Sequence, residues 1–259
     1  MDNKYSNKIQ PDKAANRGVR PLSTVLKTLD LLALFAASRR PLRLSEVTAA
    51  TGLSRATAYQ RLLTLLEAGM LEQDDGGSYR LSMYSVRLAA AALDQADIGA
   101  RAEPVLHRLC ETLGETVSLA ILDRGRPCIV ARVESDSLLR AVQEIGTMLD
   151  LEGSASGRVL TAFADAATLQ RLQDGTVPLA PPDVLAQVRA DGWAVSSGYT
   201  HSGVVGFAAP VADPRGGCAA ALSLVQPDQR FDLDHVRGPV LAAAAEISAM
   251  LRGSQETPT

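Results

Sequence analysis

The 259-residue sequence has few aromatic residues, three cysteines and no long apolar run. Aromatic residues make up 4% of the chain, so its cores must be built mainly from Leu, Val and Ala. The odd number of cysteines, Cys110, Cys128 and Cys218, excludes a fully paired disulfide framework and favours buried reduced thiols. No apolar run approaches the roughly 18 residues of a membrane helix, and the polar N-terminus does not resemble a secretory signal. We therefore expect a cytoplasmic globular protein.

Motifs for catalysis, cofactors and metals are also missing from the sequence. The stretch GSASG at 153–157 has Ala155 at its centre, where a nucleophile elbow needs serine. The three histidines are His107, His201 and His235. None lies in a pattern that activates a serine, and nothing nearby completes a metal site with His107 and Cys110. Since no phosphate-binding glycine loop is found either, we expect no enzymatic activity, no cofactor and no metal.

The length suits two domains, and the charge is divided unevenly between the two parts of the chain. Residues 1–98 hold 13 Lys and Arg against 10 Asp and Glu, a charge of +3. Residues 99–259 hold 13 against 19, a charge of −6, which gives the total of −3. A basic front on an acidic body is typical of a DNA-binding module fused to a regulatory one. Residues 1–20 show no apolar period and are expected to form a disordered arm.

Residues 21–82 are expected to form a winged helix-turn-helix. A first helix begins with Ser23 as N-cap, carries an apolar stripe and ends near Ser38. The stripe is Val25, Leu29, Leu32 and Phe35. A second helix is capped by Ser45 and ended by Gly52, and a third is capped by Ser54 and ended by Gly69. Two short extended runs, 70–73 and 78–81, then flank an Asp-Gly pair, which predicts a β-hairpin wing.

The third helix is the expected recognition helix, since the second helix of such a motif offers polar residues from its first turns to the major groove. These residues are Ser54, Arg55, Ala56, Thr57, Tyr59, Gln60 and Arg61. Arg55 and Gln60 are the candidates for base edges, because Arg pairs with guanine and Gln with adenine. Ser54, Thr57 and Tyr59 are expected on phosphates. In the wing, Tyr79 and Arg80 are expected to reach the DNA backbone or minor groove.

The rest of the chain is expected to be a linker helix, 83–98, followed by a mixed α/β domain, 99–254. The expected strands are Val117–Leu122, Cys128–Val133, Leu138–Glu144, Trp193–Ser196, Val204–Val211 and Ala219–Val225. The expected helices are 100–114, 154–165, 166–173, Pro181–Asp191 and 232–252. We therefore predict an α+β protein in which a winged helix-turn-helix is joined by a helix to a mixed α/β domain.

Several stretches together resemble the IclR family of bacterial transcriptional regulators. In the first half these are TGLSRATAYQRLLTLLEAGML (51–71) and GGSYRLS (76–82). In the second half they are ETLGETVSLAILDRGRPCIVARVES (111–135), LEGSASGRVLTAF (151–163), DGWAVSSGYTHSGVVGFAAPV (191–211) and AALSLVQP (220–227). The resemblance covers about residues 20–252. It implies a GAF-like effector-binding domain, a homodimer or tetramer on a palindromic double-stranded DNA operator, and a small organic acid as effector.

The effector site is expected around the stretch 153–157. Serine hydroxyls and backbone N–H groups at a helix start favour a carboxylate; the alternative is an ordinary serine-capped helix with glycine for close packing. The resemblance implies further polar positions in relatives that bind small polar acids, and here these are Ser196, Gly206 and Val225, with Ser223 retained. The changes predict a larger, more apolar pocket, suited to an aromatic acid. Apolar walls are expected from Met148, Leu149, Trp193, Tyr199 and Phe207.

The full set of expected effector residues is Ser154, Ala155, Ser156, Trp193, Ser196, Tyr199, Gly206, Phe207, Ser223 and Val225. The function expected from all of this is a DNA-binding regulator, a repressor, that is controlled by the bound acid. The alternatives are an activator without a small-molecule effector, and a winged-helix module that binds a protein partner through a polar, solvated helix face.

Overall fold

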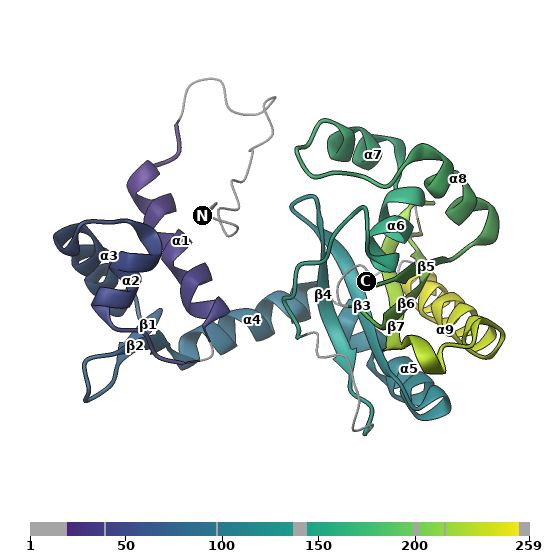
Figure 1. Ribbon diagram of the computed structural model, residues 1–259, viewed down its shortest axis with the longest axis horizontal. Coiled ribbons are helices and arrows are strands. Elements are labelled where there is room, and N and C mark those ends of the chain that lie inside the picture. The colour runs from purple at the N-terminus through teal and green to yellow at the C-terminus, as the bar shows by residue number, and fades with distance from the viewer. Residues whose placement is uncertain are drawn as a thin grey trace. The chain divides into compact units, whose positions relative to one another are not determined.

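The computed structural model describes residues 20–38, 40–96, 98–136, 144–198, 202–214 and 216–253. The chain divides after Ala92 into two compact units, and each is described by itself. The expected arm at 1–20 lies outside the described residues, apart from Arg20. Figure 1 labels the α-helices and β-strands named below.

The N-terminal unit is a winged helix-turn-helix, as predicted. Its elements are α1 (Ser23–Ala37), α2 (Leu44–Thr51), α3 (Arg55–Glu67), β1 (Leu71–Gln73), β2 (Tyr79–Leu81) and α4 (Met83–Ala96), the last of which crosses the boundary between the units. The two strands pair antiparallel as the wing, with Glu72 opposite Arg80. The core is built from Leu31, Phe35, Leu42, Val47, Ala58, Leu62, Leu65, Leu71 and Tyr79. Every element from α1 to the wing therefore contributes to one hydrophobic cluster.

The helix caps are partly as predicted. Gly52 ends α2 with φ of 69°, in the left-handed region that favours glycine, and Ser54 caps α3 by accepting from the Thr57 N–H. Ser23 and Ser45 are not caps, because the N-cap positions are Leu22 and Arg43. The start of α2 is held instead by Glu46.

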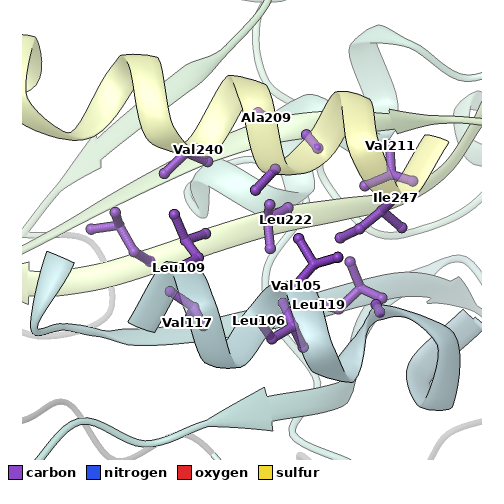
Figure 2. Packing of buried hydrophobic residues seen from close by; sticks show 14 of the residues in the cluster. Val105, Leu106, Leu109, Val117, Leu119, Ala209, Val211, Leu222, Val240 and Ile247 are labelled. Carbon is purple, nitrogen blue, oxygen red and sulfur yellow. The ribbon is translucent and has the colours of Figure 1, made fainter. Parts of the chain in front are cut away.

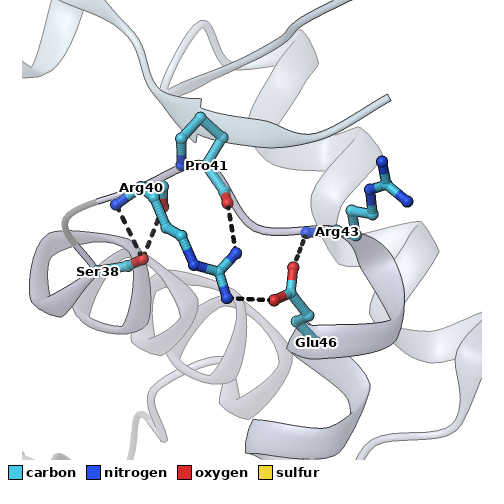
Figure 3. A network of polar contacts seen from close by, with 5 residues as sticks. All are labelled: Ser38, Arg40, Pro41, Arg43 and Glu46. Carbon is cyan, nitrogen blue, oxygen red and sulfur yellow. Dashed lines mark hydrogen bonds and ion pairs between the residues drawn. The ribbon is translucent and has the colours of Figure 1, made fainter. Parts of the chain in front are cut away.

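The Glu46 carboxylate forms a small network at the start of α2 (Figure 3). Its Oε2 accepts from the Arg43 backbone N–H at 2.8 Å, and its Oε1 lies 2.5 Å from the Arg40 guanidinium. The hydrogen bond and charge of Arg40, with the Arg43 N–H, lower the pKa of Glu46 to about 2. The network ties the chain before α2 to the first turn of that helix.

The buried face of α1 differs from the predicted stripe. Thr28, Leu31 and Phe35 are buried, whereas Val25 and Leu29 are 49% and 46% exposed. The helix carries apolar residues at two overlapping helical spacings, and the pattern alone does not tell which of them packs on its own unit. The consequence is an apolar face on α1 that the N-terminal unit leaves uncovered.

The C-terminal unit is an α/β domain built on one antiparallel sheet. Its helices are α5 (Ile98–Leu113), α6 (Ala155–Ala162), α7 (Ala166–Gln173), α8 (Pro182–Asp191), the 3-10 turn η1 (Asp228–Arg230) and α9 (Leu233–Gly253). Its strands are β3 (Thr116–Asp123), β4 (Arg126–Val133), β5 (Ala194–Ser197), β6 (Val204–Ala212) and β7 (Cys218–Pro227), and their order in the sheet is β4-β3-β7-β6-β5. The architecture agrees with the expected α/β domain. The strand expected at 138–144 lies outside the described residues, apart from Glu144.

The two faces of this sheet are covered by different helices. On one face α5 and α9 pack against the sheet, and Figure 2 shows Leu109 and Val240 of these helices beside Leu222 of β7. On the other face, Val159 and Leu160 of α6, with residues of α8, pack on small side chains of the strands. We call this second face the α6 face; it carries Ala120, Ala194, Ala208 and Ala221.

Candidate DNA-binding helix and effector-binding face

The first two turns of α3 present polar side chains to solvent. Arg55, Tyr59 and Gln60 are exposed, while Ala58 and Leu62 of the same helix are buried in the core. The helix start is rigid, because the Ser54 hydroxyl accepts from the Thr57 N–H at 3.2 Å and lies 2.9 Å from the Thr57 hydroxyl. The N-terminus of a helix also favours anions such as phosphate. The geometry therefore leaves this end of α3 open to DNA.

Three other expected DNA residues have different surroundings. Ala56 is exposed beside Arg55, and it offers only a methyl group. Thr57 is half-buried, and its hydroxyl is hydrogen-bonded to the Ser54 hydroxyl. Arg61 is half-buried, and its Nη1 donates to the Lys27 carbonyl of α1 at 3.2 Å. Arg61 thus holds α1 against α3 as well as adding positive charge.

The expectation that Tyr79 touches DNA is wrong, because the residue is 3% exposed in the core of the N-terminal unit. Its backbone bridges to Leu42, and burial raises the pKa of its hydroxyl. Neighbouring strand residues point to opposite faces, so Tyr79 and Arg80 do not share the outer surface of the wing. Arg80 is exposed, and its Nε lies 2.5 Å from Glu72.

The α6 face holds most of the expected effector residues close together. Ser196 lies opposite Gly206 in the β5–β6 pair, and Gly206 lies opposite Val225 in the β6–β7 pair. A Cβ built on Gly206 would lie 3.1 Å from the Ser196 hydroxyl and 3.8 Å from the Ala155 methyl. Ser223 lies on the same face, where its hydroxyl donates to the Ser118 carbonyl at 3.4 Å. The start of α6 and the ends of three strands therefore meet around a glycine.

The start of α6 fits both alternatives given for the sequence, a carboxylate site and a serine-capped helix with glycine for close packing. Ser154 is its N-cap: the hydroxyl accepts from the Gly157 N–H at 2.9 Å and donates to the Asp150 carbonyl. Gly157 serves close packing, because a Cβ there would lie 2.1 Å from the Asp150 carbonyl oxygen. Ser154 already uses its hydroxyl within the chain, so Ala155 and Ser156 are the residues of this turn that stay candidates for an acid.

Trp193 and Phe207 lie on the opposite face of the sheet, which corrects their expected place in the effector site. Phe207 is fully buried, its ring stacks on Trp193 with centroids 5.5 Å apart, and both pack in the cluster with α5 and α9. The strand period of two explains the error, because Gly206 and Phe207 are neighbours in β6 and point to opposite faces. Leu149 does pack on the α6 face, and Tyr199 lies outside the described residues.

One charged residue on the α6 face was not predicted from the sequence. Arg132 of β4 lies opposite Ser118 of β3, and its side chain is only 6% exposed. The signal in the sequence that could have placed Arg132 was strand alternation, counted from the buried residues Leu119 and Ile129. The bulge adds one residue to β4 and so shifts that alternation. Counting in steps of two from Ile129 therefore places Arg132 on the wrong face of the sheet.

Other polar groups of the C-terminal unit have local structural roles. Arg158 of α6 donates to the Glu152 and Val195 carbonyls, each at 2.9 Å, and so joins α6 to β5. The thiols of Cys110, Cys128 and Cys218 are free, and burial raises the pKa of Cys218 to about 12. His107 is exposed while Cys110 is buried. Among the described residues no metal-ligand cluster is found and no helix is long and apolar enough to cross a membrane.

A helix-turn-helix with a folded wing and an exposed recognition helix defines the class of DNA-binding proteins. The comparisons with known proteins specify the class further. Residues 24–75 match the IclR helix-turn-helix domain, and residues 90–249 match the bacterial transcriptional regulator IclR C-terminal domain. The chain belongs to the IclR family of transcriptional regulators, and its homologues are regulators rather than enzymes.

Three relatives illustrate the match. The glycerol operon regulatory protein of Streptomyces coelicolor is 32% identical over 235 residues, covering 87% of this chain and 92% of the relative. The structure of a putative IclR regulator from Silicibacter sp. TM1040 is 28% identical with a TM-score of 0.72, covering 91% and 100% of the two chains. An IclR homologue from Microbacterium hydrocarbonoxydans, solved with 4-hydroxybenzoate, is 24% identical with a TM-score of 0.73, covering 89% and 99%.

Proposed function

We propose that this regulator is a cytoplasmic repressor that binds a double-stranded DNA operator through α3 and responds to a small organic acid, an aromatic one, on the α6 face. The observation that carries the proposal is the exposed start of α3, where Arg55 and Gln60 project beside a capped helix N-terminus. Arg and Gln are the side chains that pair in bidentate fashion with guanine and adenine.

A second copy of the chain is the proposed partner. One helix-turn-helix covers half of an operator, and such modules act in pairs on half-sites. The uncovered face of α1 supports a homodimer, with a tetramer as the larger assembly, because Leu22, Val25, Leu26 and Leu29 leave 42–73% of their surface exposed. Apolar residues gathered on one helix face are typical of a protein interface.

An aromatic acid is the effector class that the α6 face supports best. Small residues of β5, β6 and α6 meet there, namely Ser196, Gly206 and Ala155, and they bring little bulk and no charge to this part of the face. The Microbacterium homologue binds 4-hydroxybenzoate, and an aromatic acid of that size is the first candidate for this chain.

Repression requires fewer contacts than activation from a protein with this architecture. A bound dimer that covers promoter DNA excludes RNA polymerase with no further contact, whereas activation needs a surface that engages the polymerase. A footprint that overlaps the promoter, together with lower transcription in a purified system, supports repression. A footprint upstream of the promoter with higher transcription would reverse the sign.

Calorimetric titration of the purified protein tests the effector class. The panel contains benzoate and 4-hydroxybenzoate as aromatic acids, and glyoxylate and pyruvate as two- and three-carbon acids. We expect an aromatic acid to bind at least about tenfold more tightly than the short acids, a difference of about 1.4 kcal/mol. Tight binding of a short acid without binding of an aromatic one would refute the aromatic class.

A further inference from the structure

Arg132 carries two donor atoms that make no hydrogen bond within the described part of the chain. The side chain is 94% buried, and among the described residues its buried Nε and Nη2 atoms have no hydrogen-bond partner. The carboxylate of Glu134 lies 3.0 Å from Nη2, which is an ion-pair distance without hydrogen-bond alignment. A buried charged group with unsatisfied donors is costly unless something else satisfies them.

The register of the sheet places Arg132 on the α6 face. Arg132 lies opposite Ser118, Ser118 opposite Ser223, and Ser223 opposite Ala208. Residues paired in an antiparallel sheet point to the same face, and Ala208 packs with α6. The row from β4 to β6 therefore presents a guanidinium at one end and small side chains along the rest.

The two donor atoms without a hydrogen bond match a carboxylate. Nε–H and the outward Nη2–H of an arginine are parallel and form the fork that binds both oxygens of a carboxylate. β4 and β6 are three strand spacings apart, about 14 Å. The long Arg132 side chain and the start of α6 beside Gly206 thus bound a stretch of sheet wide enough for a ring between two polar ends.

Resting on the proposed function, we infer that Arg132 binds the carboxylate of the effector and that the start of α6 faces the other end of the ligand. This assigns the acid group to β4 and not to the helix N-terminus. The same ligand must therefore lose affinity when its charge is removed, and the loss must depend on Arg132.

The experiment compares 4-hydroxybenzoate with its uncharged methyl ester, each titrated calorimetrically into the full-length protein and into Arg132→Met and Arg132→Lys. We expect the unaltered protein to prefer the acid by about tenfold to a hundredfold, as for a charged hydrogen-bonded pair. Arg132→Met should abolish the preference, and Arg132→Lys should keep part of it, because lysine retains the charge without the fork.

Arg126→Met is the matched control. Arg126 lies on the same strand and also has a buried Nε that makes no hydrogen bond among the described residues, but it lies opposite Asp123 at the turn end of β4. Its replacement should leave the preference for the acid unchanged. Thermal unfolding without ligand gives a second readout. Arg132→Met removes a buried charge, and its ion-pair partner Glu134 is 48% exposed and can be hydrated instead, so Arg132→Met should unfold no earlier than the unaltered protein.

The outcomes separate the two proposals. Acid binding by Arg132→Met with an unchanged preference over the ester would overturn the role of Arg132 and leave the aromatic effector standing. Failure of the unaltered protein to bind any acid of the panel would overturn both the effector class and the inference. Early unfolding of Arg132→Met, with acid binding retained, would show a structural arginine.

Discussion

At the scale of single residues, the side chains at the start of α3 fall into two groups. One group is exposed and can contact DNA bases, and the other forms hydrogen bonds within the protein. Arg55 and Gln60 are exposed and are free to meet base edges. Ser54 and Thr57 are engaged with each other, and Arg61 is bonded to α1. A substitution at Arg55 should therefore change recognition without changing the fold.

Arg55→Ala should cost about 1–3 kcal/mol of binding to the specific operator, and much less on random DNA, if Arg55 pairs with a base. Fluorescence anisotropy on both DNAs measures this difference. Arg124→Ala, in the C-terminal unit, removes the same charge and is the control for net charge. An equal loss on both DNAs would instead place Arg55 on a phosphate.

Glu46 gives the N-terminal unit a pH-dependent contribution to stability. Its pKa is about 2 in the folded state against an ordinary 4.5, so the carboxylate stabilises the fold above pH 4.5. That contribution is lost as the pH falls toward 2. Glu46→Gln should therefore lower the unfolding midpoint at pH 7 and lose most of this effect near pH 2.

Thermal unfolding of the full chain at several pH values tests the Glu46 network. Arg40→Met should reproduce part of the loss at pH 7, because Arg40 is the main cause of the lowered pKa of Glu46. A pH-independent difference between Glu46→Gln and the unaltered protein would contradict the assignment.

At the scale of elements, the type and order of the described helices and strands could be predicted, whereas the faces that they bury often could not. Turn glycines such as Gly52 and Gly192 ended helices where expected. The apolar residues of α1 fit two helix faces, and only packing against α3 selects Leu31 and Phe35. Phe207 and Tyr79 differ from expectation for another reason: their chemistry suits a binding site, but strand alternation turns both side chains into a hydrophobic core.

The close approach of α6 to residues 150–151 depends on Gly157. A Cβ at this position would lie 2.1 Å from the Asp150 carbonyl oxygen, so Gly157→Ala must displace backbone. We expect destabilisation of about 1–3 kcal/mol or more, measured by chemical denaturation of the C-terminal unit in the full chain.

Gly99→Ala in α5 is the matched control for Gly157→Ala. Its Cβ would lie 3.6 Å from the Ala131 methyl, an ordinary contact. Replacing a helical glycine with alanine without strain should raise the free energy of unfolding of the protein by up to about 1 kcal/mol. Equal effects of the two substitutions would contradict the packing account.

At the scale of the whole molecule, the proposed repressor acts as two copies of the chain together. Leu29→Glu places a charge on the uncovered face of α1, and it should weaken self-association at least about tenfold because the interface would bury that charge unpaired. Sedimentation measures the change. Ile145→Glu, at a residue of the C-terminal unit that is 54% exposed, should leave dimerisation intact. A dimer unaffected by Leu29→Glu would place the interface elsewhere.

The most direct test of the account is a titration of the full-length protein against the DNA beside its own gene, at two salt concentrations, with and without an aromatic acid. Each phosphate contact steepens the decline of log affinity with log salt by about 0.9, and an effector acts by favouring one of two states. We predict sequence-dependent, salt-sensitive binding whose affinity changes when the acid is added. Binding equal to that on random DNA, unchanged by any acid and by Arg55→Ala, would contradict an effector-controlled regulator that reads DNA through α3.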